Sequence, residues 1–337
     1  MKPVVGVIFT FLLAAVGTGT DAQNLHDQNE EMFKQMQEVR GVTNREITRI
    51  REVFARSSFI GQGNPAVTRH PVTPEQAATR LPRQAERYYR STRFERICGE
   101  PFMAPLYDPA TQSPEDATAC VDIFEYPNVP LAYPVVWVRA SEAAQLCASE
   151  GKRLGDAHEW EGAAAGALLE PDYRFDLAGG VGMSSAVNRM RNAHNAQYSA
   201  TRNWSYGPQY RSGVCGTGSR KTAGCNGGSF TGCGSNTYPT GSFPQCVSAL
   251  GVYDLHGNAA EHMNLPLAPD QMASAGSQTL GVTEMKGSWF IWDSIRAHED
   301  WSRWRAPFWH GSRVLSASSH RNYHLGFRCF RSLNRRR

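Results

Sequence analysis

Two stripes of hydrophobic positions near the start of the chain predict two amphipathic helices. The first stripe consists of Met32, Phe33, Met36 and Val39, and the second of Ile47, Ile50, Val53 and Phe54. Positions three and four apart share one face of a helix, so each stripe predicts one. Thr43 and Glu46 form a capping box at the start of the second helix. We expect the helices to meet at Gly41 and to pack on their own domain.

Capping signals predict three more helices. Thr73 precedes Pro74 and a box partner at Gln76, which indicates a helix start after a loop over 59–72. Ser141 precedes a helical pattern over 142–150, which Gly151 ends.

The third of these helices starts after Asp156, with Glu159 as its box partner, and its alanine-rich pattern continues to residue 167. Short strands are expected at 121–126 and 135–138. Regular periodicity fades after Cys98, so we place a domain boundary near residue 90.

The N-terminus has the pattern of a secretory signal peptide. Lys2 precedes an apolar run over 4–16, and small residues follow as far as Ala22. The run is shorter than the roughly 20 residues of a membrane helix. We therefore expect cleavage near Ala22 and export to the periplasm or the exterior, with an uncleaved anchor as the alternative. We expect no transmembrane span in the mature chain.

The cysteines and the charge narrow the class of protein further. All eight cysteines follow residue 90, and an even number in an exported chain favours disulfides over metal thiolates. The formal net charge is only +4, and export argues against a nucleic-acid partner. The basic tail over 334–337 is typical of a solvated chain end.

Several separated motifs occur in a characteristic order. They are Cys147, Gly151 to Leu154, Glu159 to Glu161, Gly251 to Glu261, and Gly326 to Cys329. The set resembles the formylglycine-generating enzyme family, also called sulfatase-modifying factor domains, over residues 98 to 330. The chain departs from the family pattern at Gly155, Asp156 and Ala157, where the family has Pro, Thr and Glu. Asp156 still caps the helix.

The resemblance implies a fold and a set of disulfides. The family fold is an α+β variant of the C-type lectin fold with little regular secondary structure. Here it would be stapled by disulfides and preceded by a helical N-terminal segment. The resemblance implies a bridge between Cys147 and Cys329, and Cys98 with Cys120 is a reasonable second pair. Three connectivities stay open for Cys215, Cys225, Cys233 and Cys246.

The resemblance also implies a calcium site. Its ligands would be the backbone carbonyls of His256, Gly257 and Ala259 and the carboxylate of Glu261. Calcium takes six to eight oxygen ligands, so further oxygens would have to come from loops over 190–245. The alternative is a tight turn at Gly257 with Glu261 in solvent.

The chemistry of the family needs two cysteines that hold Cu(I), since soft thiolates suit this ion. They follow a Gly-Ser-Trp motif, which is present here as 287–289. The positions that align with the two cysteines are Ile291 and Arg296, so copper is not expected. Iron would need histidine and carboxylate ligands, and the nearby candidates are His298, Glu299, Asp300 and His310.

The segment 289–309 holds five of the eight tryptophans, interleaved with arginines. Core packing is one interpretation, because aromatic side chains dominate core energetics. A ligand groove is the other, because tryptophan and arginine are frequent binding hot spots. We expect Trp289 in the core and one or two of Trp292, Trp301 and Trp304 exposed. The candidate ligand contacts are Trp292, Trp301, Trp304, Arg296 and Arg303.

These patterns divide the chain into three regions and leave two main classes of function. The regions are a signal peptide over 1–22, a helical region over 23–90 and a sulfatase-modifying-factor-like domain over 91–337. The first function is an exported recognition or structural module that binds protein, peptide or glycan. The alternative is a metal-dependent oxidoreductase that modifies a peptide or small molecule. Oxidation of a sulfatase cysteine is a third possibility, which the missing copper cysteines disfavour.

Overall fold

The computed structural model describes residues 25–57, 59–61, 66–225, 230–309 and 311–333. The expected signal peptide, His310 and the basic tail lie outside these residues, as does part of the expected loop over 59–72. The nine helices in the described residues are α1 (Leu25–Arg40), α2 (Asn44–Ala55), α3 (Pro74–Ala78), α4 (Ala85–Tyr89), α5 (Thr92–Cys98), α6 (Ala140–Ser149), α7 (Ala157–Ala165), α8 (Met183–Tyr198) and α9 (Phe230–Cys233). The seven strands are β1 (Met103–Leu106), β2 (Ala119–Asp122), β3 (Arg153–Leu154), β4 (Ala260–Leu265), β5 (Val282–Lys286), β6 (Leu325–Gly326) and β7 (Cys329–Ser332).

The predicted helices of the N-terminal region are confirmed. Thr43 donates its backbone N–H to Glu46 at 2.8 Å, and the N–H of Glu46 returns to the Thr43 hydroxyl at 3.3 Å. Thr73 and Gln76 form the same box at the start of α3. Each box satisfies backbone donors that the first helical turn leaves free.

Helices α6 and α7 are also confirmed, with different ends. The N-cap of α6 is Arg139 rather than Ser141, because the Arg139 N–H donates to the Glu142 carboxylate at 2.8 Å. Ser141 consequently lies inside the helix. Asp156 caps α7 as expected, and α7 ends at Ala165.

The expected strands are shorter than their sequence patterns. Of the first, expected over 121–126, only residues 121 and 122 lie in a strand, which is β2 and begins at Ala119. The expectation of a strand over 135–138 is wrong. Val136 forms a single bridge with Gly61, and Trp137 has a φ of 58°, which takes the backbone out of the extended region.

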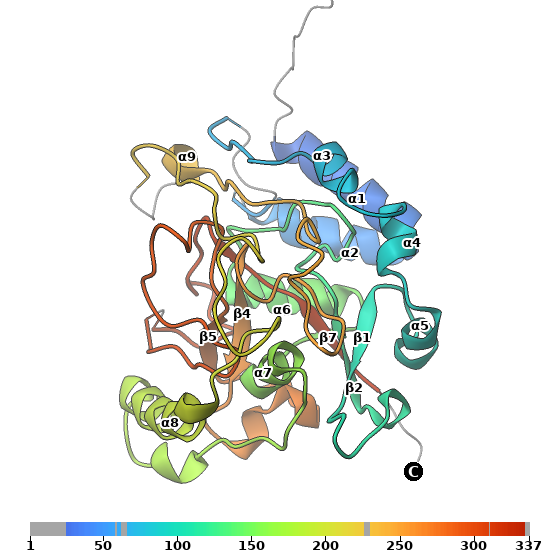
Figure 1. Ribbon diagram of the computed structural model, residues 1–337. Coiled ribbons are helices and arrows are strands. Elements are labelled where there is room, and N and C mark those ends of the chain that lie inside the picture. The colour runs from blue at the N-terminus through green and yellow to red at the C-terminus, as the bar shows by residue number, and fades with distance from the viewer. Residues whose placement is uncertain (1–24, 58, 62–65, 226–229, 310, 334–337) are drawn as a thin grey trace, which may run out of the picture.

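Two small sheets make up the regular β structure (Figure 1). One has the order β1-β2-β7-β3, and the other has the order β5-β4-β6. Strand β4 pairs antiparallel with β5 and parallel with β6. Helices α1 to α4 gather at one end of the molecule, and α8 lies toward the opposite end. The α+β class is therefore confirmed.

The N-terminal helices share a hydrophobic core with the rest of the chain. Met36 and Ile50 are fully buried together with Leu146 of α6 and Phe327 beside β7. This contact removes the apolar stripes of α1 and α2 from water, which is the largest favourable contribution to their folding.

A close approach of the backbone to a buried ring leaves no room for a side chain at Gly155. A Cβ atom at this position would lie 2.4 Å from the ring of Phe330. Phe330 is fully buried in β7 and has no room to shift. Any larger residue at 155 would push β3 and β7 apart.

A buried network of ion pairs connects the end of α1 to the segment 150–152, which follows α6. Arg40, at the end of α1, contacts the carboxylates of Glu150 and Glu100. The Lys152 ammonium contacts Glu100 and lies 2.7 Å from Asp122 on β2. Because burying a charge is costly unless it is paired, these contacts keep the network intact as a unit.

All eight cysteines are in disulfides. Cys147 pairs with Cys329, the bridge that the resemblance implies, and Cys98 pairs with Cys120. The connectivity left open is Cys215–Cys246 and Cys225–Cys233. In the part of the chain that the structure describes, no helix combines the length and the hydropathy needed to span a bilayer.

The disulfides should differ in their contribution to stability according to loop length. Cys147–Cys329 closes 182 residues and Cys225–Cys233 closes 8. In the chain-entropy model these loops correspond to about 5 and about 2.5 kcal/mol. Replacing both cysteines of each pair with alanine should therefore lower the free energy of unfolding in urea about twice as much for Cys147–Cys329. Equal losses would contradict loop closure as the cause.

Candidate ligand site in the tryptophan-rich segment

The segment 287–309 begins in a backbone position that only glycine fits. Gly287 follows β5 with a φ of 74°, and a Cβ there would lie 2.8 Å from the Leu255 carbonyl oxygen. The next residue, Ser288, is fully buried and accepts the N–H of Gly257 at 2.9 Å. The tryptophan-rich segment is thereby attached to the turn that carries His256 and Gly257.

Asp300 is a buried carboxyl that joins three segments. It accepts a hydrogen bond from Ser288 at 3.0 Å and another from the Trp204 indole N–H at 2.8 Å. Burial raises the pKa of Asp300 to about 6, although both hydrogen bonds oppose the shift. Its carboxylate Oδ2 lies 3.9 Å from Nδ1 of His256.

His256 is fully buried, and its Nε2 has no hydrogen-bond partner in the described part of the chain. The rings of Trp160 and Tyr206 contact it edge to face, at centroid distances of 6.2 and 6.0 Å. Burial lowers the pKa of His256 to about 3, so the ring is neutral at physiological pH.

Asp293 connects the tryptophan-rich segment to the loop over 210–217. Its carboxylate accepts hydrogen bonds from the hydroxyls of Tyr210, Ser212 and Thr217. Partial burial alone would raise the pKa of Asp293, but these three donors outweigh it and hold the pKa below its usual value. The carboxylate is therefore charged and holds the loop in place.

His298 lies among four tryptophans. Its ring stacks on Trp304 at a centroid distance of 4.9 Å and an interplanar angle of 4°. Trp289, Trp292 and Trp309 contact the same ring at 5.1, 4.7 and 5.3 Å. Burial lowers the pKa of His298 to about 4, so this cluster is uncharged at neutral pH.

The expectation that one or two of Trp292, Trp301 and Trp304 are exposed is wrong. Their exposed fractions are 2%, 3% and 8%, because Trp292 and Trp304 pack on the His298 ring and Trp301 lies in the same buried cluster. Trp309 is the exposed member of the segment, at 47%. Trp289 lies in the core as expected. The buried tryptophans thus pack beneath the exposed side chains of the segment.

The two candidate arginines differ in their surroundings. Arg303 is buried, donates to the Ala167 carbonyl at 2.7 Å and lies over the Tyr198 ring. Arg296 is exposed, with its guanidinium 4.4 Å from the centre of the Tyr210 ring. Only Arg296 presents its charge at the surface.

The positions that align with the copper cysteines do not fit Cu(I). Ile291 is fully buried among apolar side chains, and Arg296 carries a positive charge. Every cysteine of the chain is in a disulfide, so none offers a thiolate at this segment.

The candidate calcium ligands lie on the turn over 256–259 and at the start of β4, but Glu261 is already neutralised. The Arg328 guanidinium donates to both of its oxygens, at 2.7 and 2.8 Å, and the Trp160 N–H donates at 2.9 Å. A calcium ion would have to displace a buried arginine, so His256, Gly257, Ala259 and Glu261 do not fit the ion as they are placed. Calcium stays a prediction from the resemblance.

The iron candidates are not brought together among the residues described. Glu299 is exposed and pairs with Arg202, whereas Asp300 is buried against Ser288. A different group, Glu161, Asp172 and His194, has ligand atoms within 4.8 Å of one another. In this group Glu161 is held by Lys286 and Arg305, and Arg305 also reaches Asp172 at 2.7 Å. Two cations therefore occupy the place a metal would need.

Sequence reasoning missed the residues that hold this site together. These residues lie in irregular stretches or on α8, far along the chain from their partners in the segment: Trp204, Tyr210, Asp172 and His194. No short motif marks them. Nothing in the sequence around Trp309 distinguishes this exposed tryptophan from the buried ones.

The chain belongs to the sulfatase-modifying factor enzyme 1-like domain family, whose model matches residues 67–333. This match confirms the resemblance found from the motifs. A comparison with curated proteins found no match. Among solved structures, PvdO from Pseudomonas aeruginosa is 17% identical, covering 69% of this chain and 91% of its own, with a TM-score of 0.30. CarF is 12% identical, covering 69% of this chain and 98% of its own, with a TM-score of 0.29.

Glu261→Gln should destabilise the protein by about 3–5 kcal/mol, because it leaves the buried guanidinium of Arg328 without its counter-charge. The free energy of unfolding in urea measures the loss, with the exposed Glu170→Gln as the matched control. Because the arginine already neutralises the carboxylate, adding calcium or a chelator should leave wild-type stability unchanged. A calcium-dependent gain that the variant lacks would establish the calcium site instead.

Asp300→Asn should change the pH dependence of stability. The pKa of Asp300 is raised to about 6 in the folded chain, so the folded state binds this proton more tightly than the unfolded state. The contribution of this proton to folding stability is fully present below the pKa of Asp300 in the unfolded chain. It is lost as pH rises through the folded-state pKa of about 6. Between about pH 4 and pH 7 the variant should therefore gain about 2–3 kcal/mol relative to wild type. Urea unfolding of the variant and the wild type at both pH values measures this gain, and the exposed Asp270→Asn serves as the control. A difference in stability that does not change with pH would contradict the prediction.

Proposed function

We propose that the chain is an exported recognition module of its family rather than a copper-dependent cysteine oxidase. The proposal depends on the observation that the chain has no free cysteine. All eight cysteines pair in four disulfides, and the aligned copper positions are Ile291 and Arg296. The signal-peptide pattern and this number of disulfides support export to an oxidising compartment.

The surface of the tryptophan-rich segment supports a binding role. Trp309 is half exposed beside the His298 ring, and Arg296 is exposed two residues from that histidine. Tryptophan and arginine side chains contribute much of the energy at binding interfaces. The buried tryptophans and the Asp293 hydrogen bonds hold this surface rigid, which lowers the entropy cost of binding. The ligand class that we propose is a protein, peptide or glycan.

A metal-dependent oxidoreductase is the alternative function. It would need an open cluster of nitrogen and oxygen ligands. Within the described residues the compact histidine and carboxylate group is the one around Glu161, which two buried cations neutralise. Metal analysis of the purified protein decides between the two: stoichiometric iron or copper supports the oxidoreductase.

Thiol titration tests the absence of a thiolate pair. The denatured protein should show no free thiol before reduction and eight after it. Incubation with Cu(I), oxygen and a peptide containing Cys-x-Pro-x-Arg should form no aldehyde by mass spectrometry. Two free thiols together with aldehyde formation would overturn the proposal.

Variants at the exposed surface test the binding role. On peptide and glycan arrays, Arg296→Ala and Trp309→Ala should each weaken the wild-type signals at least ten-fold, which is about 1.4 kcal/mol. Matched controls are Arg189→Ala and Leu169→Ala, which are exposed elsewhere. Wild-type signals that persist unchanged in both surface variants would show that this surface is not the site.

A further inference from the structure

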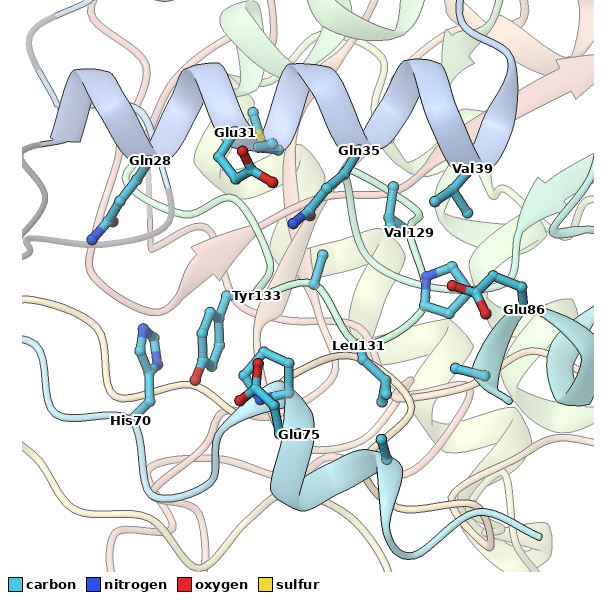
Figure 2. A pocket seen from close by; sticks show the side chains of 16 residues that line it. Gln28, Glu31, Gln35, Val39, His70, Glu75, Glu86, Val129, Leu131 and Tyr133 are labelled. Atoms are coloured by element: carbon cyan, nitrogen blue, oxygen red, sulfur yellow. The ribbon is translucent and has the colours of Figure 1, made fainter. Parts of the chain in front are cut away.

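A groove separates α1 from α3 and α4 (Figure 2). Its volume is about 540 Å³, within the range of pockets that hold ligands. Gln28, Glu31 and Gln35 extend from α1 toward Tyr133 and Glu75 on the opposite side. The groove shares no lining residue with the tryptophan-rich segment, so a ligand could bind here whether or not that segment binds one.

The floor of the groove is apolar and rigid. It consists of the buried residues 129–132, which belong to the same cores as α1 and the domain. At one end the rings of His70 and Tyr133 stack at 3.5 Å and 13°. The His70 Nδ1 lies 2.8 Å from the Thr237 carbonyl, and the Tyr133 hydroxyl donates to Val72 at 3.0 Å. The stacked pair is therefore held in place without a ligand.

The rim of the groove is acidic. Glu31, Glu75 and Glu86 line it from three different helices and are exposed. None of them forms an ion pair with another described residue, and no described lysine or arginine lines the groove. His70 adds no positive charge, because burial lowers its pKa to about 4. The groove is thus a negatively charged surface on a chain whose formal net charge is +4.

The face of α1 toward the groove also offers unused hydrogen-bonding groups. Gln28 and Gln35 are seven residues apart, two turns along one face of the helix, with Glu31 between them. Their side-chain amides make no hydrogen bond within the described part of the chain. An amide both donates and accepts, so two of them at this spacing match the backbone of an extended peptide.

We propose that this groove binds an extended segment of a partner protein that carries two or three lysine or arginine side chains. The carboxylates of Glu31, Glu75 and Glu86 would take the basic side chains. Gln28 and Gln35 would hold the peptide backbone, and the apolar floor would contact the aliphatic stems of the basic residues.

The length of the groove sets the length of the bound segment. Gln28 and Val39, at its two ends on α1, are 11 residues apart, or about 16 Å along the helix axis. An extended chain covers this distance with about five residues. A five-residue peptide with lysine at alternate positions therefore matches both the length and the three rim charges.

Fluorescence anisotropy with such a labelled peptide of alternating lysine and alanine tests the proposal on the full-length purified protein. The peptide should bind, its Kd should rise with salt, and the same peptide with acetylated lysines should not bind. The combined variant Glu31→Gln, Glu75→Gln, Glu86→Gln should weaken binding at least ten-fold. Ala78→Arg, which places a guanidinium in the groove, should also abolish binding.

Matched controls separate the groove from general electrostatics. The combined variant Glu38→Gln, Glu52→Gln, Glu170→Gln removes as much charge from exposed positions outside the groove and should leave the Kd unchanged. Gln28→Ala with Gln35→Ala should weaken the peptide but not spermidine, which has amines and no peptide backbone. Circular dichroism confirms that each variant is folded.

Three results overturn the proposal. The first is that the peptide fails to bind. The second is that the two triple Glu→Gln variants weaken its binding equally. The third is that spermidine binds as tightly as the peptide and that Gln28→Ala with Gln35→Ala weakens neither. The last result would assign the groove to free polyamines instead of a protein segment.

Discussion

The arrangement of this domain depends on one buried guanidinium. Arg328 has no exposed surface, and it reaches Glu261 on β4 as well as the backbone carbonyls of Asp122, Ile123 and Tyr253. Removing a charge from water costs several kcal/mol unless its partners are all in place. The strand ends on both sheets are therefore fixed relative to each other, because any displacement would leave a charged donor unsatisfied. Lys152 and Arg305 impose the same constraint at two other points.

The motifs that reveal the family make buried contacts that hold the fold together. Trp160 and Glu261 contact each other, Glu159 holds Arg153, and Glu161 neutralises Lys286 and Arg305. Except for the contact between Arg153 and Glu159, these contacts join residues far apart in the chain, and a change in either partner would break each of them. A chain can therefore keep every one of these contacts whichever residues stand at positions 291 and 296, where this chain has Ile291 and Arg296.

Local signals in the sequence were sufficient for α1, α2, α3, α6 and α7 but missed α4, α5, α8 and α9, and the class of fold came from the resemblance to the family. The capping boxes at Thr43, Thr73 and Asp156 are formed between residues three apart, so they can be recognised without tertiary information. The site was less predictable, because its hydrogen bonds join residues far apart in the chain. Asp293 and Asp300 accept hydrogen bonds from Trp204, Tyr210, Ser212 and Thr217, which lie 76 to 96 residues away. The predicted strand over 135–138 was wrong because strand pairing also depends on distant residues. Within the described residues Val136 pairs only with Gly61.

The order of the disulfides along the chain has a consequence for biogenesis. An oxidase that joins cysteines as they emerge would correctly form Cys98–Cys120 and Cys225–Cys233. It would also join Cys147 to Cys215, and Cys246 to Cys329, neither of which occurs in the folded chain. Reaching the native set then requires thiol–disulfide exchange through mixed intermediates. The maturation of this domain is accordingly suited to a cell that supplies a disulfide isomerase alongside its oxidase.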